Sequence, residues 1–180
     1  EMTTDKTFSF TQTSKTDLEH QSKDEAITAT FSSKGLTFND NNVKFSSKGT
    51  GNLTITAYVA TISKIELKIS RNKTDKPEKI TPVTVEKSGI ISVEDGKTPR
   101  QITVDWNEDN NTVTFSSATG DLFVFGATIY YQDIPGELRL LSVTAPTITL
   151  NTYETTTSQL SFTITQTAKV QEGTTLETWY

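Results

Sequence analysis

The chain has 180 residues, enough for one full-sized domain or for one domain and a fragment of another. Its 22 acidic and 17 basic residues give a net charge of -5, and the basic residues are scattered, which argues against nucleic acid or an anionic membrane surface as the main partner. Cysteine is absent, which excludes disulfides and thiolate chemistry, and no apolar run approaches the roughly 18 residues of a membrane span, which excludes membrane insertion by a helix.

The first sixty residues show short alternating segments separated by turn residues. Apolar side chains at every second position are typical of half-buried strands. Gly35 and the run 39–42 are rich in residues that favour turns, and they separate the alternating segments. The pattern predicts strands around residues 8–10, 27–31, 36–38, 43–45 and 53–59.

The segment 16–26 interrupts this series because it is polar. Only Leu18 and Ala26 are available for burial, so we interpret the segment mainly as a loop. It contains the single histidine, His20, which we expect at the surface. A Ser-His-Asp relay needs a positioned nucleophile beside the histidine, and the surrounding residues supply none. One histidine without cysteine also excludes a simple zinc site.

The middle of the chain continues the alternation with one interruption. Ile62 is out of phase with the apolar residues of 65–69, which predicts a tight turn or a bulge near Ser63. Two later alternating segments, 83–85 and 91–93, flank a short polar turn. We therefore predict that these two segments pair as a hairpin.

The stretch 101–131 is the one around which the rest of the chain is organised. Alternation over 102–106 and 112–115 predicts two strands, with a turn at 107–111 because Asn and Asp tolerate left-handed backbone. The run 122–125 has no polar residue, so we place it in the centre of a sheet.

The spacing of these segments predicts the fold class. Strand signals recur about every 8 to 12 residues, which is typical of an antiparallel sandwich rather than of alternating strands and helices. About a fifth of the residues are threonine, which favours strands. We predict an all-β, antiparallel β-sandwich of jelly-roll type with little or no helix, formed by residues 1–133, and a separate β segment formed by residues 134–180.

Three stretches carry a resemblance to a known module. They are GNLTITAYVATISKIELKIS, VTVEKSGIISVEDGK and ITVDWNEDNNTVTFSSATGDLFVFGATIYY. Together they resemble a jelly-roll β-sandwich module that is common in secreted and cell-surface proteins of gut bacteria, and the resemblance covers about residues 27–131. It implies an ancillary, non-catalytic module, located outside the cell or on its surface, beside glycan-processing or adhesive domains.

The tail beyond residue 133 has a different pattern. Pro135 and Gly136 interrupt the alternation, and apolar residues at 148–150 and 160–164 then supply strand pairs that resemble the opening of a fibronectin-type or immunoglobulin-like module. The roughly 35 residues after the Ala-Pro pair at 145–146 fall below the size that usually folds alone. The tail must therefore pack on the first domain, belong to a truncated second domain, or pair with another chain, for example in a homo-oligomer.

Aromatic residues are the first candidates for a binding site because a flat apolar ring stacks on a sugar. Trp106 is the obvious candidate, although it shares a face with two aliphatic residues, a pattern typical of a core residue. Tyr58 shares its face with threonines, so we expect it to be exposed. Tyr130 and Tyr131 point to opposite sides of a strand, and we expect one of them to face solvent.

Acidic residues are the second candidates. Asp105, Glu108 and Asp109 lie close together in sequence, but acidic residues at strand ends and turns are typically solvated, so we predict no enzyme. The same loop, with Asp40 in NDNN, offers oxygen ligands of the kind that calcium prefers, although neither matches an EF-hand loop. Calcium is therefore the one cofactor that this sequence suggests, at Asp105, Asp109 and Asp40.

These observations predict a non-catalytic, extracellular binding or adhesion module. A glycan is the first ligand class and a surface protein the second. The alternative is a structural protein of a fibre or virion surface that assembles as an oligomer. The two differ in outcome, because a binding module is expected to be a monomer with a shallow aromatic face, whereas a structural protein is expected to be a stable oligomer without sugar binding.

Overall fold

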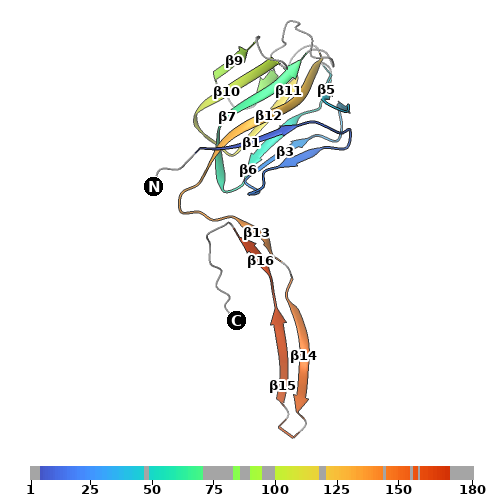
Figure 1. Ribbon diagram of the computed structural model, residues 1–180, viewed down its shortest axis with the longest axis vertical. Coiled ribbons are helices and arrows are strands. Elements are labelled where there is room, and N and C mark those ends of the chain that lie inside the picture. The colour runs from blue at the N-terminus through green and yellow to red at the C-terminus, as the bar shows by residue number, and fades with distance from the viewer. Residues whose placement is uncertain are drawn as a thin grey trace. The chain divides into compact units, whose positions relative to one another are not determined.

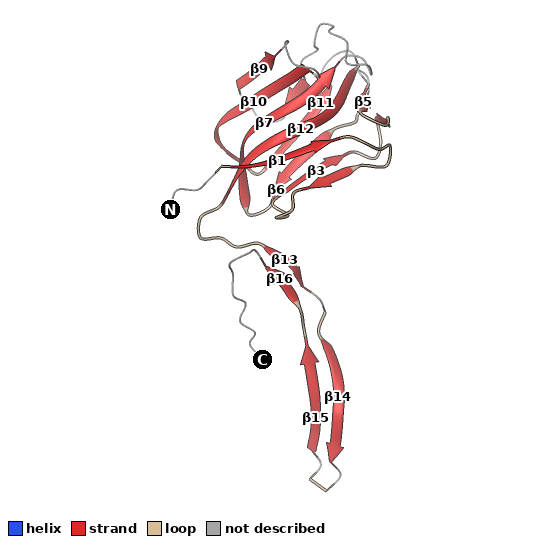
Figure 2. Cartoon of the chain, in the orientation of Figure 1, coloured by secondary structure: helices blue, strands red, loops and turns tan. Residues whose placement is uncertain are grey.

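The computed structural model describes residues 5–46, 49–70, 83–85, 90–94, 100–117, 121–143, 145–154, 156–157 and 159–170. Within its strands, side chains are described everywhere except at 83–85, 90–94, 100–110, 142–143 and 154. Every regular element in these ranges is a β-strand (Figure 2). The chain divides into two compact units, Glu1–Glu137 and Leu138–Tyr180, close to the boundary expected at residues 133–134.

The first unit contains two antiparallel sheets (Figure 1). The larger sheet, sheet A, has the order β4-β5-β12-β7-β10-β9, with β1 also beside β12. Its strands are β1 (Lys6–Thr11), β4 (Leu36–Phe38), β5 (Val43–Phe45), β7 (Ala60–Ser70), β9 (Ile90–Glu94), β10 (Arg100–Asn110) and β12 (Leu122–Asp133). The smaller sheet, sheet B, has the order β2-β3-β6-β11-β8 and consists of β2 (Glu19–Gln21), β3 (Ile27–Phe31), β6 (Leu53–Ala57), β8 (Val83–Val85) and β11 (Thr112–Ser117).

The inner faces of the two sheets form one core. In β6, Leu53 and Ile55 are completely buried, whereas the threonines between and after them point outward. Ile55 lies between Ala29 of β3 and Val113 of β11, both of which are also completely buried. These side chains belong to one apolar cluster with residues of sheet A. The prediction of an all-β antiparallel sandwich with little or no helix is therefore confirmed.

Strand β12 lies at the centre of sheet A, as its apolar run predicted. It pairs with β7 on one side, and on the other side it pairs first with β5 and then with β1. At Gly126, where β1 begins to pair, a Cβ atom would overlap the carbonyl oxygen of Phe10. Glycine is required there because only the absence of a side chain lets the two backbones approach so closely.

The bulge expected near Ser63 is present. Lys64 pairs with Tyr130 and Ile62 pairs with Tyr131, which leaves Ser63 as an extra residue in β7. The extra residue shifts the alternation by one, so that both Ile62 and Ile65 are completely buried. The bulge thus keeps the inner face apolar along all of β7.

Two sequence predictions about connections were wrong. The segments 83–85 and 91–93 do not form a hairpin, because β8 pairs with β11 in sheet B and β9 pairs with β10 in sheet A. The turn predicted at 107–111 is also displaced, since β10 continues to Asn110 with a register shift after Asp105. Alternation identifies which side chains point inward, but both sheets of a sandwich have the same inward pattern, so it does not identify the sheet.

The segment 16–26 is mainly loop, as expected, but it contains a short strand, and His20 in that strand is half-buried rather than on the surface. Residues 19–21 form β2, which pairs with β3. The half-buried His20 ring stacks on Phe10 with 4.3 Å between ring centroids and meets the edge of Phe31. Its Nε2 lies 3.0 Å from Oε1 of Gln12. A histidine therefore occupies the inward position where the sequence pattern offered no apolar residue.

The described part of the second unit contains two pairs of strands. β13 (Leu140–Val143) pairs with β16 (Ala168–Val170), and β14 (Thr147–Glu154) pairs with β15 (Gln159–Thr165). The described side chains of β14 and β15 are all exposed. We call the pair β14–β15 the ribbon.

Candidate functional site

The outer face of sheet B carries a regular array of threonines. Antiparallel pairing aligns them in two rows across β3, β6 and β11, because directly opposite residues in paired strands lie on the same face. All six are exposed or half-buried. We call this array the threonine face: Thr28, Thr56 and Thr112 form one row, and Thr30, Thr54 and Thr114 form the other.

The inward residues of the same strands determine this face. Ile, Leu, Val and Ala at alternate positions fill the core, so the threonines between them must point outward. Threonine suits such positions because its branched side chain packs well on a pleated sheet. Within the second row, the hydroxyls of Thr54 and Thr114 lie 3.4 Å apart.

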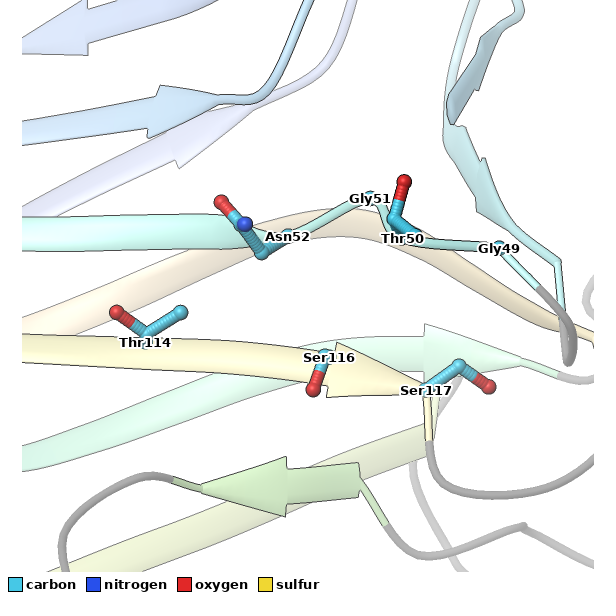
Figure 3. Close-up of a pocket in the computed structure, with 7 residues that line it drawn as sticks. All are labelled: Gly49, Thr50, Gly51, Asn52, Thr114, Ser116 and Ser117. Atoms are coloured by element: carbon cyan, nitrogen blue, oxygen red, sulfur yellow. The ribbon is translucent and has the colours of Figure 1, made fainter. Parts of the chain in front are cut away.

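A shallow hollow of about 280 Å³ continues the threonine face toward one end of β11 (Figure 3). Thr114 belongs to both features, and Asn52, the residue directly before the neighbouring strand β6, faces it (Figure 3). The backbone of Asn52 is fixed, because its N–H donates to Oγ of Ser32 at 3.0 Å and its carbonyl accepts from the Ser32 N–H at 2.9 Å. The lining residues are Gly49, Thr50, Gly51, Asn52, Thr114, Ser116 and Ser117.

Close packing of backbone shapes the hollow beside Gly51. Gly35 has a φ of +77°, and a Cβ atom on it would lie 2.6 Å from the backbone nitrogen of Gly51. A Cβ atom on Gly51 would in turn overlap the side chain of Leu36. Glycine at both positions therefore lets the turn before β4 pack against the segment that enters β6.

The lining of the hollow is uncharged. Its side chains offer hydroxyl groups and one amide, which both donate and accept hydrogen bonds. Such groups do not take up or release protons near neutral pH, so the arrangement is suited to holding a polar ligand rather than to acid–base chemistry.

The predicted aromatic residues are not brought together. Tyr58 lies in the turn between β6 and β7 and is 47% exposed, as expected. Tyr130 is half-buried on the outer face of sheet A, where its hydroxyl donates to Glu66 at 3.0 Å and Nζ of Lys64 lies 4.2 Å from its ring centroid. Tyr131 is buried, so one of the two neighbouring tyrosines faces solvent, as expected. Trp106 belongs to β10, and its side chain lies outside the described residues.

The predicted acidic residues are also separated. Asp40 is exposed in the turn between β4 and β5, and its carboxylate lies 3.8 Å from Nζ of Lys15. Asp105 belongs to β10, and two strands, β12 and β7, separate β10 from β5. Within the part of the chain whose side chains are described, no three potential metal ligands cluster.

Calcium binding at Asp105 and Asp109 stays a prediction because their side chains are not described. A melting temperature measured with and without millimolar calcium tests it. Beside Asp40, two side-chain amide oxygens already accept hydrogen bonds. Asn42 Oδ1 accepts from Asn39 Nδ2 at 2.8 Å, and Asn41 Oδ1 accepts from Asn42 Nδ2 at 2.7 Å.

A partly buried polar network links sheet A to the turn before β3 on a different part of the sandwich. The Tyr131 hydroxyl of β12 donates to Asp24 at 2.8 Å, and the other carboxylate oxygen of Asp24 accepts from Ser22 at 2.7 Å. Lys6 lies 3.6 Å from Asp24 and 2.5 Å from Asp133. Burial, together with the hydrogen bond to Asp24, raises the pKa of Tyr131 well above its usual value. This network is structural, since it joins sheet A to the turn that precedes β3.

Comparison of the chain with known protein families, curated proteins and solved structures finds no match. The resemblances to a jelly-roll module and to a fibronectin-type or immunoglobulin-like module therefore stay predictions. Among the described residues, no helix is long and apolar enough to cross a membrane.

Sequence reasoning missed the hollow. Its two sides come from 49–52 and 114–117, which are far apart in sequence and meet only because β6 pairs with β11. The available signal was the Gly-Thr-Gly triplet at 49–51 directly before a strand with outward threonines, since glycine next to a strand permits close backbone approach.

Proposed function

We propose that this protein is a non-catalytic binding module that holds a glycan against the threonine face and the adjoining hollow. The single observation that carries the proposal is the continuity of the two features through Thr114. Together they form an array of hydroxyl, methyl and amide groups, bordered at Thr30 by the carboxylate of Glu19, which accepts from the Thr30 hydroxyl at 3.5 Å. A neutral, hydroxyl-rich ligand suits such a surface better than a charged one, because no side chain of the array offers an opposite charge.

The geometry of a sheet gives the array a repeat that a polymer can match. Neighbouring strands are about 4.8 Å apart, and outward residues along one strand are about 6.7 Å apart. An extended polysaccharide presents hydroxyl groups at regular intervals and could meet several threonines at once. Each hydrogen bond contributes only about 0.5–1.5 kcal/mol net, so we expect weak binding to each sugar unit and higher affinity for longer chains.

The proposal includes a location outside the cell or on its surface, where such polymers are encountered. It also retains the resemblance to ancillary modules of secreted bacterial proteins. A surface protein is the second ligand class.

An NMR titration with soluble polysaccharides tests the proposal. We expect the methyl signals of Thr54 and Thr114 to shift on addition of the ligand. The double variant Thr54→Val, Thr114→Val keeps the shape of both side chains and removes their hydroxyls, and we expect it to lose most of the binding. Thr128→Val is the matched control, because Thr128 lies on the outer face of sheet A with its hydroxyl 2.8 Å from that of Ser9. Equal loss in both variants, or no shift with any polysaccharide, would refute the proposal.

A second candidate function is a structural protein of a fibre or particle surface, and the exposed apolar side chains of the ribbon favour it. The two functions are separable by experiment. The structural function predicts a stable oligomer that forms without sugar, whereas the binding function predicts ligand-dependent shifts on the threonine face in either oligomeric state.

A further inference from the structure

The ribbon has one entirely apolar face. Its pairing places Ile148 opposite Ile164 and Leu150 opposite Phe162, and directly opposite residues share a face. Tyr153 lies opposite Leu160 farther along the ribbon. We call these six side chains the apolar face: Ile148, Leu150, Tyr153, Leu160, Phe162 and Ile164.

A bulge keeps this face continuous. Leu150 pairs with Phe162 and Thr152 pairs with Ser161, so Asn151 is an extra residue in β14. Without the extra residue, Tyr153 would point to the opposite face. The Asn151 amide donates to the Thr163 hydroxyl at 2.7 Å and so anchors the bulge on the polar side of the ribbon. The opposite face carries only polar residues, mostly threonines.

All six side chains of the apolar face are exposed. Their exposed fractions are 68% at Ile148, 61% at Leu150, 56% at Tyr153, 60% at Leu160, 53% at Phe162 and 40% at Ile164. A two-stranded ribbon is marginally stable by itself in water, and contiguous apolar patches of this kind mark interaction surfaces. The ribbon therefore needs a second layer.

We propose that this second layer is the apolar face of a second copy of the chain, packed face to face. At roughly 100 Å² for each half-exposed side chain, six side chains expose about 600 Å². Two copies would then bury about 1,200 Å² in total, which reaches the lower limit of stable protein–protein interfaces. Two stacked ribbons would reproduce the two-layer packing that the first unit achieves within one chain.

The charge of the ribbon favours an identical partner. Glu154, the last residue of β14, is the one charged residue of the two strands, and none of the six residues of the apolar face is charged. Two copies packed through this face would therefore bring no like charges together within it. A partner recognised by charge would find no complementary group on this face. The pair Leu150–Phe162 lies in the middle of the apolar face, between the pair Ile148–Ile164 and the pair Tyr153–Leu160. A two-fold axis near the middle pair would exchange the two ends. Apolar side chains of one copy would then lie opposite apolar side chains of the other along the whole face.

Sedimentation of the full chain over a range of concentrations, about 1 to 100 µM, tests the proposal. We expect a monomer–dimer equilibrium in the wild type. Leu150→Lys would place a charge on the apolar face, and we expect it to weaken dimerisation at least about 100-fold. Thr149→Lys is the matched control, because it adds the same side chain at the next position on the opposite face, and we expect it to dimerise like the wild type. A monomer at every concentration, or equal loss in both variants, overturns the proposal.

Single-cysteine variants keep the proposal testable if Leu150→Lys disrupts the ribbon. The chain contains no cysteine, so Leu150→Cys and Thr149→Cys each introduce one reporter. We expect a maleimide to label Leu150→Cys at least about 10-fold more slowly at dimer-forming concentrations than after dilution, and to label Thr149→Cys equally fast in both. Protection of Leu150→Cys that does not change on dilution would show a cover within the same chain and would overturn the proposal.

Discussion

The two units of this protein use the same sequence pattern with opposite results. In β6 of the sandwich, Leu53 and Ile55 alternate with threonines and are completely buried. In β14 of the ribbon, Ile148 and Leu150 also alternate with threonines, yet they are 68% and 61% exposed. The difference is that the sandwich supplies a second sheet, whereas no described strand forms a second layer over the ribbon. Alternation thus specifies an apolar face, but it does not specify what covers that face.

The largest expected effect contrasts a core phenylalanine with a ribbon phenylalanine. Phe115 is 1% exposed and Phe162 is 53% exposed. We expect Phe115→Ala to lower the free energy of unfolding of the sandwich by about 3–5 kcal/mol, because it leaves a cavity in a closed core. Phe162→Ala should change that transition by less than about 0.5 kcal/mol. Denaturant unfolding followed by tryptophan fluorescence measures both, and a comparable loss in the two variants would contradict the contrast.

The sequence was sufficient wherever a local pattern determined the structure. The phase break at Ile62 predicted the bulge at Ser63, and the apolar run 122–125 predicted the central strand of sheet A. The exposure of Tyr58 beside the outward threonines of β6 was also predicted from alternation. Each of these features depends on which face of one strand is buried, which period-2 alternation reports directly.

The sequence was insufficient wherever the answer depended on contacts between distant segments. The assignment of β8 and β9 to different sheets follows from pairing with β11 and β10, which alternation does not encode. The strand at 19–21 was missed because its inward residue is His20, a polar side chain that contributes its ring to the core. The hollow beside Thr114 was missed because it requires β6 and β11 to be neighbours.

The second expected effect contrasts the two neighbouring tyrosines of β12. Both hydroxyls donate to a carboxylate, that of the buried Tyr131 to Asp24 and that of the half-buried Tyr130 to Glu66. We expect Tyr131→Phe to lower the free energy of unfolding by about 1.5–3 kcal/mol, because it removes a hydrogen bond to a charged group from a tyrosine that is only 4% exposed. The matched control Tyr130→Phe should cost less than about 1 kcal/mol, since water replaces the lost partner.

The same pair predicts a difference in alkaline solution. Because the pKa of Tyr131 is raised in the folded state, the unfolded state releases this proton first, and stability falls as the pH rises above the usual tyrosine value of 10.0. We expect the Tyr131→Phe variant to lack the part of the alkaline loss of stability that comes from Tyr131. The Tyr130→Phe variant should retain it. Unfolding curves recorded across this pH range decide the matter, and parallel curves for the two variants would count against the structural role of the network.

The smallest expected effect concerns His20, the polar residue that closes one end of the sandwich core. The Gln12 amide nitrogen donates to the carbonyls of Ser14 and Asp17, so its oxygen is the group that accepts from His20. This arrangement suits a neutral ring with its proton on Nε2. Burial lowers the pKa of His20 below the usual 6.5, an effect that Asp17 partly opposes.

Acidification should therefore weaken the sandwich through this ring. As the pH falls below 6.5, the unfolded state takes up a proton that the folded state resists, so the free energy of unfolding decreases until the lowered pKa is passed. His20→Phe retains an aromatic ring against Phe10 and removes the titration. We expect the stability of the wild type relative to this variant to decrease as the pH falls below 6.5. A constant difference between the two would show that His20 titrates alike in the folded and unfolded states, and that its place against Phe10 has no electrostatic cost.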